Sequence, residues 1–156
     1  LQDSKKLTPS KRDQLYDFIY ENTPYIGIGI ISHKRIDQIN ILQATLMAMK
    51  LAIRRLSVLP CEILVDGNQV PNLGNTLPIS AIIKGDETIP AISAASIIAK
   101  VTRDRIMAKL HKAYPHYALD QNKGYGSEEH YEGIFTYGPS PIHRLSFNLT
   151  RQETLF

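Results

Sequence analysis

Strand-like and helix-like segments alternate along the chain, and this alternation constrains the fold more than any other feature of the sequence. Short apolar runs rich in β-branched residues predict strands, whereas apolar residues recurring every three or four positions predict amphipathic helices. Strands that alternate with helices are typical of an α/β domain with at least some parallel pairing. The expected helices cover residues 7–22, 39–56, 92–114 and about 128–136, and the expected strands cover 25–32, 62–65 and 79–84.

The first expected helix has a start signal as well as an apolar face. Thr8 suits the N-cap position, and Pro9 suits the first turn, where its missing N–H is not needed. Leu15, Phe18 and Ile19 share one face of this helix at helical spacing.

Composition places the chain among globular proteins. Its 156 residues, 43% of them hydrophobic and 21% charged, are enough for one domain with a substantial core. No apolar run approaches the roughly 18 residues of a membrane span, and the polar start "LQDSKK" predicts no signal peptide, so no membrane partner is expected. Cys61 is the only cysteine, which excludes an intrachain disulfide and favours a reducing, cytoplasmic location. The net charge of +3 permits a polyanionic partner without requiring one.

Two carboxylates are candidates for one functional site. Asp66 ends the apolar run "EILVD", a position where a charge is costly unless something compensates it. Asp104 follows Ser96 and Lys100 at intervals of four residues, which places a hydroxyl, a cation and a carboxylate on one helix face. Spacing alone also allows an ordinary turn at Asp66-Gly67-Asn68 and an ordinary exposed ion pair between Lys100 and Asp104.

The C-terminal third contains a second candidate site. In "NKGYGS", two glycines flank Tyr125 and leave the face of its ring open to a sugar, while Lys123 could contact a phosphate. A tight turn with a half-buried tyrosine explains the same pattern. His143-Arg144, in "GPSPIHR", is either a further phosphate contact or a surface pair.

Six motifs occur together and in order along nearly the whole chain: "DSKKLTPSKR", "INILQATLMAMKLAI", "ILVDGN", "IIKGDETIPAISAASIIAKVTRDR", "KGYGS" and "GPSPIHR". This combination resembles the bacterial ribonuclease HII family, the type 2 ribonucleases H. The resemblance implies a single ribonuclease H-like domain over 1–156, with a mixed sheet flanked by helices. It also implies endonucleolytic cleavage of RNA in RNA–DNA hybrids and at ribonucleotides embedded in duplex DNA.

The resemblance assigns roles to individual residues. It makes Asp66 and Asp104 catalytic ligands of Mn²⁺ or Mg²⁺, hard cations that prefer oxygen donors. Two such ions about 4 Å apart can activate water and stabilise a leaving oxygen. Lys5 matches a basic block near the nucleic-acid backbone, and Tyr125 matches a ring that packs on the sugar beside the scissile junction. We also expect Lys100 and Lys123 to contact the substrate.

One part of the family pattern is missing. Family members start with a strand carrying an adjacent Asp-Glu pair, followed by a Gly-Arg-Gly element and a second strand. The only Asp-Glu pair here, Asp86-Glu87, is followed by Thr88-Ile89. The chain therefore resembles an N-terminally truncated ribonuclease HII. It lacks the first two strands of the family, two of its four metal ligands and the element that reads the ribose 2′-OH.

The missing motif leaves more than one function open. The chain is either a metal-dependent endoribonuclease, impaired by the truncation, or a remnant that binds nucleic acid without cutting it. A different ribonuclease H-like nuclease, such as a junction resolvase, is a third alternative. We expect a monomer, in which the missing strands make strand exchange possible.

Overall fold

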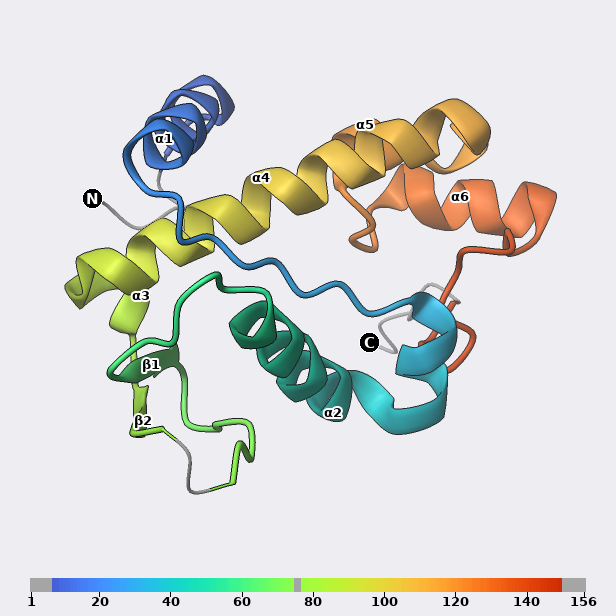
Figure 1. Cartoon of the computed structure of the whole chain (residues 1–156). Coiled ribbons are helices and arrows are strands. Elements are labelled where there is room, and N and C mark those ends of the chain that lie inside the picture. Colours follow the sequence, from blue (N-terminus) through green and yellow to red (C-terminus); the bar gives the residue numbers. More distant parts are fainter. Residues whose placement is uncertain (1–6, 75–76, 150–156) are drawn as a thin grey trace. The chain divides into compact units, whose positions relative to one another are not determined.

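The computed structural model describes residues 7–74 and 77–149 (Figure 1). Most predicted elements are confirmed to within two residues at each end, whereas the helix expected at 39–56 begins earlier, at His33. None of the described helices is long and apolar enough to cross a membrane. The elements are α1 (Pro9–Asn22), α2 (His33–Arg54), β1 (Ile63–Asp66), β2 (Ile79–Ile82), α3 (Gly85–Thr88), α4 (Pro90–Ala113), the 3₁₀ helix η1 (Pro115–Tyr117), α5 (Leu119–Asn122) and α6 (Glu128–Tyr137).

The sheet is small and parallel. β1 and β2 pair in register, with Ile63 opposite Ile79 and Asp66 opposite Ile82. The pairing continues one residue further, because the N–H of Gly67 donates to the carbonyl of Ile82 at 2.9 Å. The protein is therefore α/β, rich in helix, with the parallel pairing that the sequence predicted.

The chain divides into two compact units, and the divisions fall within α2 and α4. Unit 1 contains residues 1–31 and 41–101, and unit 2 contains residues 32–40 and 102–156. In α2 the division coincides with Asn40, whose φ of 65° and ψ of 168° interrupt the helix. Residues with a Cβ rarely adopt this region. The single domain expected over 1–156 stays a prediction.

The core of unit 1 joins α1 to the first part of α4. Ile19 of α1 packs with Ile97, Ile98 and Val101 of α4, and Ile97 is fully buried. Burial of each such side chain contributes about 1.5–3 kcal/mol. The N-cap prediction for α1 is confirmed, because Thr8 accepts a hydrogen bond from Lys11 N through its hydroxyl.

The three apolar residues that share a face of α1 are not equally buried, since the side chain of Phe18 is 59% exposed. Ile19 is the buried residue of α1, and Leu15 packs against the same core from a partly buried position. The core therefore covers a narrower stripe of α1 than the apolar pattern suggested.

The segment 25–32 was expected to be a strand, and this prediction is wrong, because no strand is assigned there. The carbonyl of Ile28 instead accepts a hydrogen bond from Arg55 Nη1. The close approach expected from the glycines is confirmed. A Cβ added to Gly27 would lie 2.0 Å from the carbonyl oxygen of Ala52, and one added to Gly29 would lie 1.8 Å from that of Ala48.

Unit 2 has its own core. Tyr117, Leu119 and Ile134 are buried together, and Met107 and Leu110 of α4 pack against them. The chain segments of η1, α5 and α6 lie beside the C-terminal part of α4 (Figure 1). This core supports the loop that contains Tyr125.

Candidate metal centre and nucleic-acid interface

Asp66 is the last residue of β1, and its carboxylate is oriented by a backbone donor. Gly85 N, at the start of α3, donates a 2.9 Å hydrogen bond to Oδ1 of Asp66. Gly85 is buried, and a Cβ there would lie 2.5 Å from Cδ1 of Ile92. The glycine therefore lets α3 approach closely enough for its N–H to reach the carboxylate.

The carboxylate of Asp66 is suited to be a metal ligand. The residue is exposed, and within the described part of the chain its hydrogen bond from Gly85 involves Oδ1 and not Oδ2. An oriented, exposed carboxylate oxygen is the donor type that Mn²⁺ and Mg²⁺ prefer. No group of three or more His, Cys, Asp or Glu side chains among the described residues could hold a metal ion. Asp66 therefore fits as one ligand of a centre that needs further donors.

The other residues predicted for the site lie in α4 or outside the described part of the chain. Asp104 and Lys100 are half-exposed residues of α4, and each already interacts with another group. Asp104 belongs to unit 2 and Asp66 to unit 1, so the convergence of the two carboxylates stays a prediction. Lys5 lies outside the described residues.

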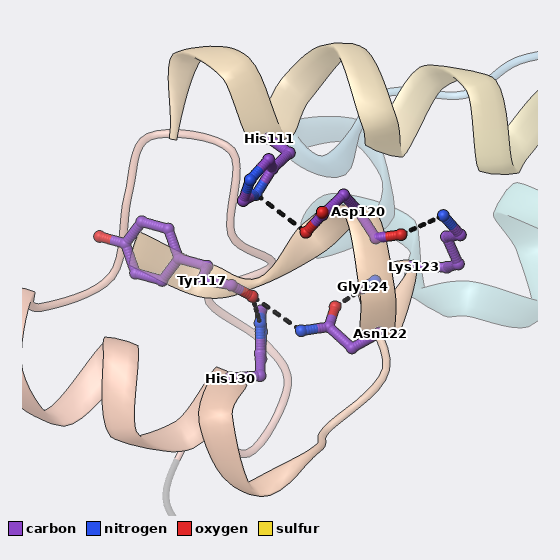
Figure 2. Close-up of polar contacts among 7 residues, drawn as sticks. All are labelled: His111, Tyr117, Asp120, Asn122, Lys123, Gly124 and His130. Atoms are coloured by element: carbon purple, nitrogen blue, oxygen red, sulfur yellow. Dashed lines mark hydrogen bonds and ion pairs between the residues drawn. The ribbon is translucent and has the colours of Figure 1, made fainter. Parts of the chain in front are cut away.

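The loop of Tyr125 is built by short-range hydrogen bonds (Figure 2). The carbonyl of Tyr117 accepts from Asn122 Nδ2 at 2.7 Å and from His130 Nδ1 at 3.0 Å. Asn122 Oδ1 in turn accepts from Gly124 N at 2.8 Å. The amide of Asn122 thus links the buried Tyr117 to the turn just before Tyr125.

Lys123 takes part in the same turn. Its backbone has a φ of 53°, and its ammonium group donates to the carbonyl of Asp120. Asp120 Oδ1 also lies 3.2 Å from His111 Nδ1, although neither atom has an aligned hydrogen-bond partner within the described chain (Figure 2). An ammonium group has three donors, so Lys123 keeps the capacity for a phosphate contact while it binds Asp120.

Tyr125 itself is 64% exposed, with an arginine beside its ring. The guanidinium carbon of Arg103 lies 5.7 Å from the ring centroid, within the range of a cation–π contact. Arg103 Nη2 also donates to the carbonyl of Lys123 at 3.0 Å. The open ring face that the flanking glycines suggested is consistent with this exposure.

Arg103 was not singled out from the sequence. It precedes Asp104 in "TRDR", and no local pattern connects it to Tyr125, 22 positions later. A basic residue on the helix that contains a candidate catalytic carboxylate was the one available signal.

Arg144 is a second arginine of unit 2. Burial lowers the pKa of Arg144, the charge of Arg103 lowers it further, and Asp37 and Tyr125 raise it. Its guanidinium carbon lies 4.8 Å from the ring centroid of Phe147. Unit 2 therefore gathers Arg103, Arg144 and an exposed aromatic ring, a combination typical of surfaces that bind single- or double-stranded nucleic acid.

His143 is buried and hydrogen-bonded, so it is not a surface residue. It is 8% exposed, and its Nδ1 accepts from Ser140 N at 2.9 Å and lies 2.8 Å from Ser140 Oγ. Its ring stacks on His130 with centroids 5.2 Å apart. Burial, followed by the charge of His130, lowers the pKa of His143. The imidazole therefore holds the backbone next to Arg144 in place.

Comparison with known proteins agrees with this architecture. The family model described as Ribonuclease HII matches residues 1–150. Ribonuclease HII of Coxiella burnetii is 46% identical over 156 residues, which are 100% of this chain and 76% of that protein. Ribonuclease HII of Geobacter sulfurreducens is 50% identical over 154 residues, or 97% of this chain and 69% of that protein.

A solved structure is similar as well. The ribonuclease H2 from Pyrococcus horikoshii OT3 matches with a TM-score of 0.75 and 30% identity, over 96% of this chain and 77% of that one. The fold and sequence together define a nuclease with a ribonuclease H-like fold. The chain belongs to the ribonuclease HII family, a family of endonucleolytic hydrolases.

Proposed function

We propose that the chain provides the catalytic domain of a metal-dependent endoribonuclease that cleaves RNA in RNA–DNA hybrids and at single ribonucleotides in duplex DNA. The supporting observation is the oriented carboxylate of Asp66 in a chain of the ribonuclease HII family. Asp66 and Asp104 are proposed as ligands of Mn²⁺ or Mg²⁺. The bound metal would activate water for attack on the phosphodiester and stabilise the leaving oxygen.

The chain's own residues have separate roles in this proposal. The N–H of Gly85 holds Asp66 in one orientation, so that little side-chain freedom is lost when a cation binds. Arg103, Lys123 and Arg144 neutralise backbone phosphates, and the ring of Tyr125 packs on a sugar. The sequence has no Asp-Glu pair followed by Gly-Arg-Gly, so we expect this chain alone to cleave slowly.

A second candidate function is nucleic-acid binding without cleavage. The basic and aromatic surface around Tyr125 favours it, because that surface uses none of the proposed metal ligands. The two functions make different predictions, since binding needs no divalent metal.

The deciding experiment measures cleavage by the chain with Mn²⁺, with Mg²⁺ and with EDTA. The substrates are an RNA–DNA hybrid, a DNA duplex with one ribonucleotide, and an all-DNA duplex. We expect slow, metal-dependent incision of the first two only. Asp66→Asn should abolish it, because the neutral amide is a poor ligand for a hard cation, while the Oδ1 acceptor for Gly85 N is kept.

Two outcomes would contradict the nuclease proposal. One is incision that persists in Asp66→Asn, which would indicate a contaminating enzyme. The other is binding of the hybrid with no incision at any metal concentration, which would favour the second function. Glu62→Gln, an equal change of charge near the start of β1, is the matched control and should cleave like the parent chain.

We further propose that the chain acts as a cytoplasmic monomer. Cys61 is exposed and forms no disulfide, which fits a reducing compartment. Light scattering across a tenfold range of concentration tests the monomer. A dimer would instead support strand exchange between chains.

A further inference from the structure

One carboxylate in unit 2 binds a turn more than a hundred residues away. Asp37, in the first part of α2, accepts from Ser146 N at 3.0 Å and from Ser146 Oγ at 2.6 Å through Oδ1. Its Oδ2 accepts from Leu145 N at 3.0 Å. The bonds from Ser146, the side-chain bond first, lower the pKa of Asp37. Both oxygens therefore hold one short piece of backbone.

That piece of backbone presents Arg144. The residue directly precedes Leu145, and the N–H of Phe147 donates to the carbonyl of Arg144 at 3.2 Å, which closes the turn. On the other side His143 is held through its Nδ1 by Ser140. The backbone of Arg144 is thus fixed on both flanks, while the guanidinium lies against the ring of Phe147.

Unit 2 contains a second guanidinium, that of Arg103, whose carbon lies 5.7 Å from the ring centroid of Tyr125. Burial lowers the pKa of Arg144, the charge of Arg103 lowers it further, and Asp37 and Tyr125 raise it. The repulsion between two guanidinium charges is unfavourable in isolation. A phosphate oxygen that contacts both would relieve the repulsion, because guanidinium groups bind phosphate through paired N–H donors.

We propose that Asp37 is a positioning residue for substrate binding, which holds the Leu145–Ser146 backbone so that Arg144 contacts a phosphate beside Tyr125. This inference rests on the proposed function for the nature of the ligand. The competing explanation is that Asp37 only ties residues 32–40 to the rest of unit 2. In that case its loss would lower stability and leave the binding of nucleic acid unchanged.

Loss of the Asp37 charge alone and loss of a positioning contact have opposite expected effects on binding. Removal of a negative charge from a surface that binds a polyanion should tighten binding. A positioning role of Asp37 predicts weaker binding, because the backbone that presents Arg144 would no longer be held. Asp37→Asn is therefore compared with Glu62→Gln, which removes the same charge from an exposed site in unit 1.

The measurement is the affinity for a labelled RNA–DNA hybrid in EDTA, from 50 to 300 mM KCl. We expect Asp37→Asn and Arg144→Ala each to weaken binding by roughly 3- to 10-fold and to reduce the slope of log K against log salt by about 0.9, the value for one phosphate contact. Glu62→Gln should keep the parent slope. The double variant Asp37→Asn/Arg144→Ala should bind like Arg144→Ala alone.

The inference would be overturned if Asp37→Asn bound the hybrid more tightly or kept the parent slope of log K against log salt. Additive losses of affinity in the double variant would also overturn it, and so would a parent chain that does not bind the hybrid. If Asp37→Asn does not fold, Ser146→Ala replaces it, because it removes only the hydroxyl donor. If Ser146→Ala reduces the slope of log K against log salt, even by less than Asp37→Asn is expected to, the proposal is supported. An unchanged slope in Ser146→Ala overturns it. Cleavage is measured separately, so a chain that binds as described but never cuts contradicts the proposed function and not this inference.

Discussion

The backbone N–H of Gly85 donates to the Asp66 carboxylate across 19 residues of sequence. This contact depends on the absence of a side chain at position 85, where a Cβ would lie 2.5 Å from Ile92 Cδ1 and 3.2 Å from Ile82 Cβ. The orientation of the proposed metal ligand is therefore coupled to the packing of α3.

Gly85→Ala should lower both stability and activity. An added methyl group in this buried position forces α3 outward, which we expect to cost about 1–3 kcal/mol of unfolding free energy. The same shift lengthens the bond to Asp66, so metal-dependent cleavage should fall more than the loss of folded protein explains. Urea denaturation and a rate per folded molecule measure the two effects. Ile83→Ala, at a side chain 76% exposed, is the control and should change neither.

In a complete ribonuclease HII that also has the Asp-Glu and Gly-Arg-Gly motifs, Tyr125→Ala should weaken cleavage at a single embedded ribonucleotide by one to two decades. Loss of ring stacking costs on the order of 1–3 kcal/mol, by comparison with base–aromatic contacts. Tyr125→Phe should be nearly neutral, because the ring provides the packing. The cleavage rates of both variants are measured on a duplex with one ribonucleotide and on a long RNA–DNA hybrid. If Phe is as harmful as Ala, the hydroxyl matters and stacking is not the explanation.

His143 should make stability depend on pH. Burial of the ring, followed by the charges of His130 and His33, lowers the pKa of His143, although the backbone hydrogen bond with Ser140 raises it. Tyr117, whose ring lies 4.7 Å from that of His143, supplies no opposite charge. The unfolded chain binds the proton more readily, so stability should decrease as pH falls below about 6.5.

The slope attributable to His143 should not exceed about 1.4 kcal/mol per pH unit. Urea denaturation between pH 5 and pH 8 measures it, and His143→Gln should remove that component of the slope. His116→Gln, at an exposed histidine stacked on Tyr137, is the matched control. Stability that rises as the pH falls through this range would contradict the assignment.

Gly29→Ala should be among the most destabilising substitutions in unit 1. The new Cβ would meet the carbonyl oxygen of Ala48 at 1.8 Å, and helix backbone cannot move aside as a side chain can. We expect a loss of about 3 kcal/mol, at the upper end for overpacking. Ile30→Ala, at a neighbouring side chain 56% exposed, should cost far less in the same denaturation experiment. Equal losses would show that the close approach is not maintained in solution.

Local chemistry was sufficient for much of the secondary structure. Thr8 and Pro9 start α1 where capping rules predict, and α4 ends at Ala113, two residues before Pro115. Caps and proline act within one helical turn, so their effect can be read from neighbouring residues. The six ordered motifs, among them those around Asp66 and Tyr125, likewise indicate the ribonuclease HII family from the sequence.

Only the tertiary structure decided the rest. The apolar run at 25–32 has the composition of a strand, but a strand needs a partner, and the segment packs its glycines on α2 instead. The contacts of Asp37 and Arg103 could not be predicted from the sequence, because their partners, Ser146 and Tyr125, are distant along the chain. A hydrogen bond or ring contact depends on distance in space, and pairs separated by 22 and by 109 residues leave no local periodicity that would reveal them.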